Sequence, residues 1–123
     1  QGVQFVIDNL KRMKGGELYV PKIPSMKVTD LARAIGPECE QKIIGIRPGE
    51  KLHEVMISED DARGAYEYDD HFVIYSEAYG PIEPGPGGRR VSEGFRYSSD
   101  KNDRWLSAED LAPMIAPFAG EKR

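Results

Sequence analysis

The sequence predicts a small α/β protein with few short strands and four or five helices. Apolar residues at helical spacing alternate along the chain with short runs of β-branched and aromatic residues, which are typical of strands. Only about three strands are expected, and so few would form a weak sheet on their own. The first helix is amphipathic but has no obvious local partner. The chain therefore resembles half of a larger structure.

Length and composition narrow the class of protein. The 123 residues suffice for one domain with a modest core, and 39% apolar with 31% charged residues indicate a folded, soluble chain. A net charge of −4 without a long basic cluster argues against nucleic-acid binding. No apolar stretch approaches the roughly 20 residues of a membrane helix. A single cysteine, Cys39, excludes an internal disulfide and fits a reducing compartment, so we expect a cytoplasmic protein.

The first 37 residues predict helix, strand and helix. The first helix is indicated by Val3, Val6, Ile7, Leu10 and Met13, which recur at helical spacing. Gly15 and Gly16 end it, and residues 17–20 form a short strand. Thr29 is the expected N-cap of a second helix, which runs to Ile35 and ends at Gly36-Pro37.

The centre of the chain contains the most informative run. Residues 43–46 (Ile-Ile-Gly-Ile) predict a strand that carries Arg47 at its end. Pro48 and Gly49 then turn the chain, and residues 50–56 are expected to begin a helix. A residue at the end of a strand is well placed for ligand contacts in α/β proteins.

The remainder predicts two capped helices, a strand and a loop. Ser58 to Asp61 and Ser107 to Asp110 both match a capping box, and Pro113 should keep the second of these helices short or kinked. Phe72 to Tyr75 predict a third strand. Between Gly80 and Gly88 glycine and proline dominate, so a loop without regular structure is expected.

Arg47 and Glu50 are the best candidate ligand-binding pair. An arginine can form two hydrogen bonds to a phosphate, and Glu50 can accept hydrogen bonds from ribose hydroxyls, which together suggest a nucleotide-like ligand. A surface ion pair between the two is the alternative. Met26 lies in an extended, proline-containing segment, where it could contact a base or sugar or fill the core.

No catalytic or metal site is evident. Two histidines and one cysteine make a zinc site improbable. No G-x-G-x-x-G fingerprint of a dinucleotide fold follows a strand. Tyr97 and Lys101 have the Tyr-x-x-x-Lys spacing, but the intervening Ser-Ser-Asp favours a turn over a helix, so we interpret this match as coincidental.

Three long segments resemble a known family. Gly15 to Ala32, Ile43 to Ile57 and Phe95 to Ser107 are similar to the C-terminal portion of inverting (5-epimerising) UDP-N-acetylglucosamine 4,6-dehydratases. These enzymes belong to the extended short-chain dehydrogenase/reductase superfamily and supply bacterial polysaccharide and glycan synthesis. The resemblance covers nearly the whole chain except the loop at residues 80–90, to which it assigns no role.

The resemblance implies a two-part lyase that is a homo-oligomer when full length. An N-terminal Rossmann half, absent here and expected before Gln1, would hold NADP and the catalytic residues. The C-terminal part would clamp the UDP-sugar, with Arg47 on the diphosphate, Glu50 on the ribose and Asn102 as a further contact. Residues 1–76 would form the substrate-binding portion, 77–94 the loop and 95–123 the tail with a short helix. This chain would carry no catalytic residue and no cofactor, and would be inactive alone.

The sequence leaves two alternatives open. One is a non-catalytic binding or interaction module, in which the first helix could dock a partner. The other is part of a related UDP-sugar epimerase or capsule-synthesis enzyme, which would share Arg47 and differ in the missing half.

Overall fold

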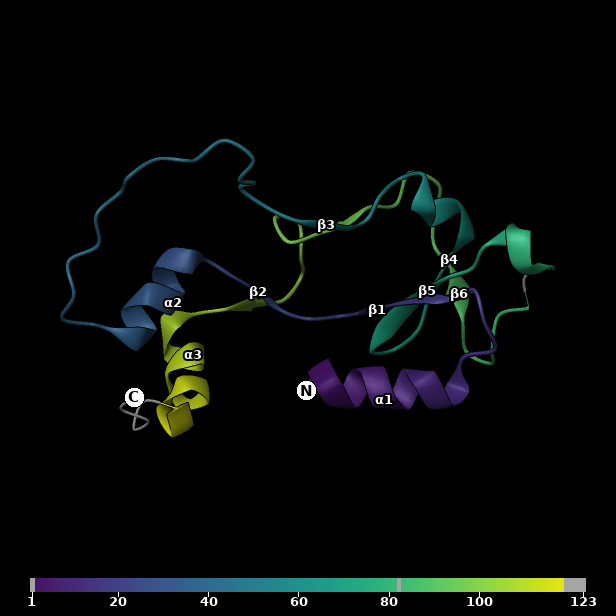
Figure 1. Ribbon diagram of the computed structural model, residues 1–123, viewed down its shortest axis with the longest axis horizontal. Helices are drawn as coiled ribbons and strands as arrows, with labels where there is room; N and C mark the ends of the chain where they lie inside the picture. Colours follow the sequence, from purple (N-terminus) through teal and green to yellow (C-terminus); the bar gives the residue numbers. More distant parts are fainter. Residues whose placement is uncertain (1, 82, 119–123) are drawn as a thin grey trace. The chain divides into compact units, whose positions relative to one another are not determined.

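The structure is a computed structural model that describes residues 2–81 and 83–118 (Figure 1). Three α-helices are present in these residues: α1 (Gly2–Arg12), α2 (Val28–Ile35) and α3 (Ala108–Ile115). The short 3-10 helices are η1 (Asp61–Gly64), η2 (Glu77–Tyr79) and η3 (Ala116–Phe118). The strands are β1 (Leu18–Pro21), β2 (Ser25–Met26), β3 (Val55–Ile57), β4 (Ala65–Glu67), β5 (His71–Ile74), β6 (Arg89–Arg90), β7 (Tyr97–Ser98) and β8 (Trp105–Leu106).

These elements form two compact units, each built from two stretches of chain. Unit 1 comprises Gln1–Lys22 with Val55–Ser98, and unit 2 comprises Ile23–Glu54 with Ser99–Arg123. This division differs from the consecutive segments 1–76, 77–94 and 95–123 expected from the sequence. Each unit is assembled by pairing strands distant in sequence, which composition along the chain does not reveal.

Unit 1 contains the main sheet and core. The sheet is antiparallel with strand order β1-β5-β4-β6, and β3 pairs separately with β7. The core cluster consists of Val20, Ile57, Ala62, Ala65, Phe72 and Tyr97. The Phe72 ring lies 5.1 Å from the Tyr97 ring and 5.4 Å from the Phe95 ring, measured between centroids. Aromatic pairs at these separations add to the stabilisation from buried area.

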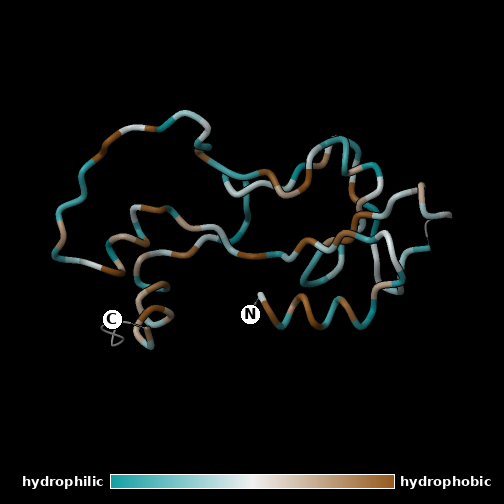
Figure 2. The backbone as a smooth tube through the Cα atoms, in the orientation of Figure 1, coloured by the Kyte–Doolittle hydropathy of each residue, from teal (hydrophilic) through white to brown (hydrophobic). Residues whose placement is uncertain are grey.

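The first helix is confirmed, but most of its apolar side chains are exposed. Polar and apolar residues alternate along α1 (Figure 2). Its Phe5 ring packs edge-on against the His71 ring of β5, 6.3 Å between centroids. Val3 remains 77% exposed and Leu10 62% exposed. The helix therefore contacts the rest of unit 1 through part of its surface only.

Buried His71 is held between aromatic rings and an exposed carboxylate. The Tyr68 ring stacks on it at 4.8 Å between centroids, and Tyr19 stacks on it at 5.7 Å. Its Nδ1 lies 2.6 Å from Oδ1 of Asp70. This hydrogen bond lowers the pKa of the Asp70 carboxyl, because it stabilises the ionised form.

This bond predicts a pH-dependent contribution to stability. A carboxyl group whose pKa is lowered by folding stabilises the protein at pH values above its pKa in the unfolded chain, here 3.8. This contribution is lost as the pH falls through the pKa of the folded state. The stability gap between the native chain and Asp70→Asn should thus be largest near neutral pH and close in acid. Urea unfolding at a series of pH values measures this gap, and a gap independent of pH would contradict the assignment.

The glycine- and proline-rich loop lacks helix and strand at residues 80–81 and 83–88, as predicted; residue 82 lies outside the described residues. The Tyr68 hydroxyl donates to the carbonyl oxygen of Gly85 at 3.4 Å. A Cβ at Gly88 would lie 2.6 Å from the same hydroxyl oxygen. The absence of a side chain there lets the loop approach Tyr68 closely.

Unit 2 contains α2, α3 and a parallel pair of strands. β2 pairs with β8 through Ser25 with Trp105 and Met26 with Leu106, and α2 packs against α3. The capping box at the start of α3 is confirmed: Ser107 accepts from the Asp110 backbone N–H, and the Asp110 carboxylate accepts from that of Ser107. The reciprocal Ser58 and Asp61 bonds before η1 are confirmed as well.

Three predictions about regular elements are wrong. Thr29 is not an N-cap, because α2 begins at Val28 with Lys27 as its N-cap. Residues 43–46 form no strand, and Ile43 and Ile44 are 94% and 81% exposed. Residues 50–56 form no helix, because residues 55–57 pair as β3 with β7. A strand requires a partner, and no described strand pairs with residues 43–46.

The expected helix and strand counts also need correction. The described residues contain three α-helices, not four or five, and eight strands, not about three. Most of these strands are two or three residues long. Such strands are defined by tertiary pairing and leave little periodicity in the sequence.

Candidate functional site

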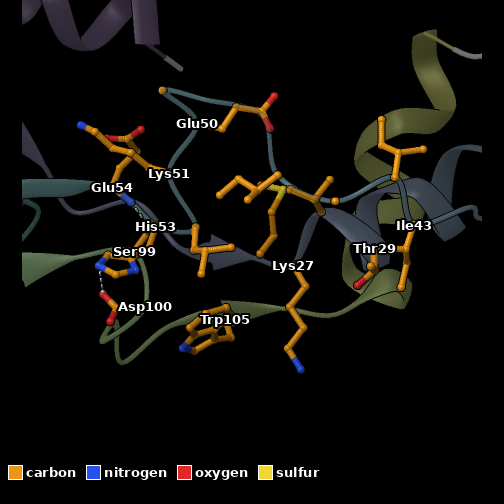
Figure 3. A pocket seen from close by; sticks show the side chains of 17 residues that line it. Lys27, Thr29, Ile43, Glu50, Lys51, His53, Glu54, Ser99, Asp100 and Trp105 are labelled. Atoms are coloured by element: carbon orange, nitrogen blue, oxygen red, sulfur yellow. Dashed lines mark hydrogen bonds and ion pairs between the residues drawn. The ribbon is translucent and has the colours of Figure 1, made fainter.

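A large hollow lies within unit 2 and has a volume of about 1070 Å³. We call it the unit 2 hollow; Figure 3 shows the side chains around it. It is lined by Met26, Lys27, Val28, Thr29, Ile43, Ile44, Gly45, Ile46, Gly49, Glu50, Lys51, Leu52, His53, Glu54, Ser99, Asp100 and Trp105. Its lining combines apolar side chains with charged ones, so it offers contacts both to an apolar and to a charged part of a small molecule.

The Arg-Pro-Gly-Glu sequence forms the predicted turn. The Glu50 backbone N–H donates to the Arg47 carbonyl oxygen at 3.0 Å, and Gly49 has φ +87°. Proline followed by a residue of positive φ is typical of a type II turn, in which glycine avoids backbone strain. The turn therefore follows from local sequence although the flanking strand and helix do not form.

Arg47 and Glu50 are brought together as an ion pair. Arg47 Nε donates to Glu50 Oε1 at 2.6 Å, and the Arg47 backbone N–H donates to Oε2 at 2.7 Å. The Arg47 side chain is 78% exposed. Its two terminal NH₂ groups have no hydrogen-bond partner among residues 2–81 and 83–118. Glu50 thus orients the guanidinium and leaves its outer edge available.

Glu50 and Met26 line the unit 2 hollow, whereas Arg47 and Asn102 are outside its lining. Arg47 adjoins the hollow through its bond to Glu50. Met26, in β2, is 39% exposed and therefore does not fill a core. The structure places three of the four predicted site residues in or next to one hollow.

Asn102 organises the chain around the hollow. Its side-chain Nδ2 donates to the Ile23 carbonyl oxygen at 2.7 Å and to Ser25 Oγ at 3.1 Å. Its Oδ1 accepts from the Arg104 backbone N–H at 3.1 Å. Asn102 therefore joins the segment before β8 to β2.

Trp105 is a lining residue that the sequence interpretation missed. Its Nε1 donates to the Asn102 carbonyl oxygen at 2.7 Å, and the residue is 46% exposed. Two features of the sequence could have pointed to it: Trp105 is the only tryptophan of the chain, and it lies three residues after Asn102 in a segment that resembles the family. No residue pattern linked it to residues 43–54, since that proximity is tertiary.

The charged groups of the lining are partly paired. Lys51 Nζ lies 3.3 Å from Glu54 Oε2, and His53 Nε2 lies 3.8 Å from Asp100 Oδ1. Within the described part of the chain, no group of three His, Cys, Asp or Glu residues is arranged to hold a metal ion. Exposed pairs of this kind contribute little to stability and can exchange partners with a ligand.

The Tyr-x-x-x-Lys spacing does not lie on a helix. Tyr97 is buried in β7, and residues 99 and 100 form a turn before exposed Lys101. Another tyrosine, Tyr75, has its hydroxyl 3.2 Å from that of Tyr68 beside a hollow of about 300 Å³ in unit 1. Burial, followed by the hydrogen bond with Tyr68, raises the Tyr75 pKa, so this phenol stays protonated at neutral pH.

Comparison with known proteins confirms the resemblance found in the sequence. A family model described as a polysaccharide biosynthesis protein matches residues 1–76. The chain is 47% identical over 122 residues to a UDP-N-acetylglucosamine 4,6-dehydratase (inverting) from Campylobacter jejuni subsp. jejuni serotype O:2. A protein of the same name from serotype O:23/36 is 46% identical. Each match covers 93% of this chain and 36% of the dehydratase, in its C-terminal part.

The fold also has a counterpart among solved structures. An X-ray structure of Pen from Bacillus thuringiensis matches with a TM-score of 0.76 and 29% identity. The match covers 94% of this chain and 35% of that protein. This chain therefore spans only about a third of the length of the relatives that it matches. Among the described helices, none is long and apolar enough to cross a membrane.

Proposed function

Since this chain belongs to the polysaccharide biosynthesis protein family, we propose that it is the UDP-sugar-binding C-terminal part of a UDP-N-acetylglucosamine 4,6-dehydratase. The observation that carries the proposal is the Arg47–Glu50 turn at the unit 2 hollow. It supplies a guanidinium with an unpartnered outer edge next to a carboxylate that lines an apolar hollow. Anion and hydroxyl recognition on one turn suits a nucleoside diphosphate.

Each predicted residue has a distinct part in this proposal. The two terminal NH₂ groups of Arg47 donate hydrogen bonds to the diphosphate, while its Nε stays hydrogen-bonded to Glu50. Each Glu50 oxygen accepts one hydrogen bond from Arg47 and keeps a lone pair for a ribose hydroxyl. Met26 contributes an apolar contact from β2. Asn102 contributes to sugar-nucleotide binding indirectly, because its hydrogen bonds fix the segment before β8 against β2.

The chemical steps belong to the longer enzyme in this proposal. This chain has no G-x-G-x-x-G turn between a strand and a helix, so its residues do not fit NADP, and we assign the cofactor to a Rossmann domain of the full-length protein. We further propose that the full-length protein is a cytoplasmic homo-oligomer.

Titration of the 123-residue chain with UDP tests the proposal. Weak but saturable chemical-shift changes are expected at Gly49, Glu50 and their neighbours, because one turn supplies the polar contacts. Incubation with UDP-N-acetylglucosamine is expected to release no 4-keto sugar. Absence of shifts at millimolar UDP would overturn the binding proposal, and turnover by the chain alone would overturn the assignment of catalysis to the missing part.

A non-catalytic interaction module is the second candidate. The exposed apolar residues of α1, including Val3 and Leu10, favour it. The same titration separates the two functions, since an interaction module has no requirement for UDP.

A further inference from the structure

Trp105 is exposed to an extent unusual for the largest apolar side chain. It is the only tryptophan of the chain and keeps 46% of its surface accessible. Large aromatic side chains supply much of the energy of cores and interfaces when they are covered. An aromatic face left open beside a hollow is therefore available to a ligand.

The orientation of the indole is fixed by the chain around it. Its Nε1 donates to the Asn102 carbonyl oxygen, and the Asn102 amide donates in turn to Ile23 and Ser25. Trp105 is also the register partner of Ser25 in the β2–β8 pair. A preorganised ring loses little conformational entropy when a ligand stacks on it.

Trp105 and the Arg47–Glu50 turn approach the unit 2 hollow from different sides. Figure 3 shows Glu50 and Trp105 on opposite sides of the hollow, with apolar side chains between them. Met26, Ile46 and Leu52 supply apolar lining. The hollow thus has a polar edge suited to ribose and phosphate and an aromatic side suited to a flat ring.

We propose that Trp105 is the stacking platform for the pyrimidine base of the nucleotide sugar. This inference rests on the proposed function and adds a residue that contributes base affinity to the same site. The Nε1 hydrogen bond uses the edge of the indole, so its face remains for the base. Stacking of this kind tolerates any planar base and adds affinity that phosphate contacts alone do not provide.

Tryptophan fluorescence tests the inference directly, because the chain has a single reporter. UDP and uridine should each change the Trp105 emission saturably, whereas inorganic pyrophosphate should not. Excitation at the red edge of the tryptophan band, with free N-acetyltryptophanamide as a reference, corrects for light absorbed by the nucleotide.

Substitutions provide the second measurement. Trp105→Ala should weaken UDP binding by roughly five- to 150-fold in an NMR titration, and Trp105→Phe should retain most of the affinity. Phe118→Ala is the matched control, since Phe118 is a 72% exposed aromatic of unit 2 outside the hollow. Its UDP affinity should match that of the native chain.

The outcomes separate this inference from the proposed function. UDP binding without a change in Trp105 emission, or equal UDP affinity in all three variants, would overturn the stacking role and leave the proposed function intact. Failure of the native chain to bind UDP would overturn both. Should Trp105→Ala not fold, the native emission and Trp105→Phe decide the question.

Discussion

Replacing Arg47 with alanine is expected to weaken UDP binding by about ten- to over a hundredfold. Charge-assisted hydrogen bonds contribute roughly 1.5–3 kcal/mol, which corresponds to that range of affinity. The side chain is exposed and paired only with Glu50 among the described residues, so its removal should leave the fold intact. Arg47→Lys keeps the positive charge but cannot form the two parallel hydrogen bonds of a guanidinium, so it should bind UDP with intermediate affinity.

The measurement is isothermal titration of the full-length protein with UDP, accompanied by chemical-shift titration of this chain. Arg63→Ala is the matched control. Like Arg47, Arg63 is exposed and forms an ion pair with a carboxylate three residues distant in sequence, Asp60, but it lies outside the unit 2 hollow. Unchanged UDP affinity in Arg47→Ala, or an equal loss in Arg63→Ala, would refute the phosphate role.

Replacing Ile57 with alanine is expected to lower the free energy of unfolding of unit 1 by about 2–5 kcal/mol. Ile57, in β3, is fully buried within the core cluster of unit 1. Removing the three side-chain carbons beyond Cβ loses buried area and leaves a cavity that the surrounding residues cannot fill completely. In a small unit that loss is a large part of the total stability.

The matched control is Ile43→Ala, because Ile43 is 94% exposed. The same chemical change there should alter stability by less than about 0.5 kcal/mol. Hydrogen exchange at the β5 amides measures the stability of unit 1 in both variants. Equal exchange rates in the two variants would show that Ile57 is not the core residue described.

Local patterns predicted the elements whose stability is local. The first helix follows from apolar spacing, and α3 begins at a capping box because Ser107 and Asp110 satisfy each other's backbone N–H groups. The turn at Pro48-Gly49 follows from proline's fixed φ and glycine's tolerance of positive φ. Each of these structures is decided by residues within about one helical turn of one another.

Residues 43–46 show where such patterns fail. Three isoleucines in four positions favour a strand, yet strand formation depends on a partner with free backbone groups. No described strand pairs with them. The helix expected over residues 50–56 fails for a related reason: residues 55–57 pair with β7, some 40 residues away, and no local pattern reveals that pairing.

The sequence by itself determined the family of the protein, through three long segments of resemblance. It also determined the Arg-Pro-Gly-Glu turn, because a tight turn depends on residue identity over a short span. Only the tertiary structure decided that the chain divides into two units and that Trp105 and Met26 share a hollow with Glu50. Those proximities join residues up to about 80 positions apart through backbone pairing and side-chain packing, which no local pattern encodes.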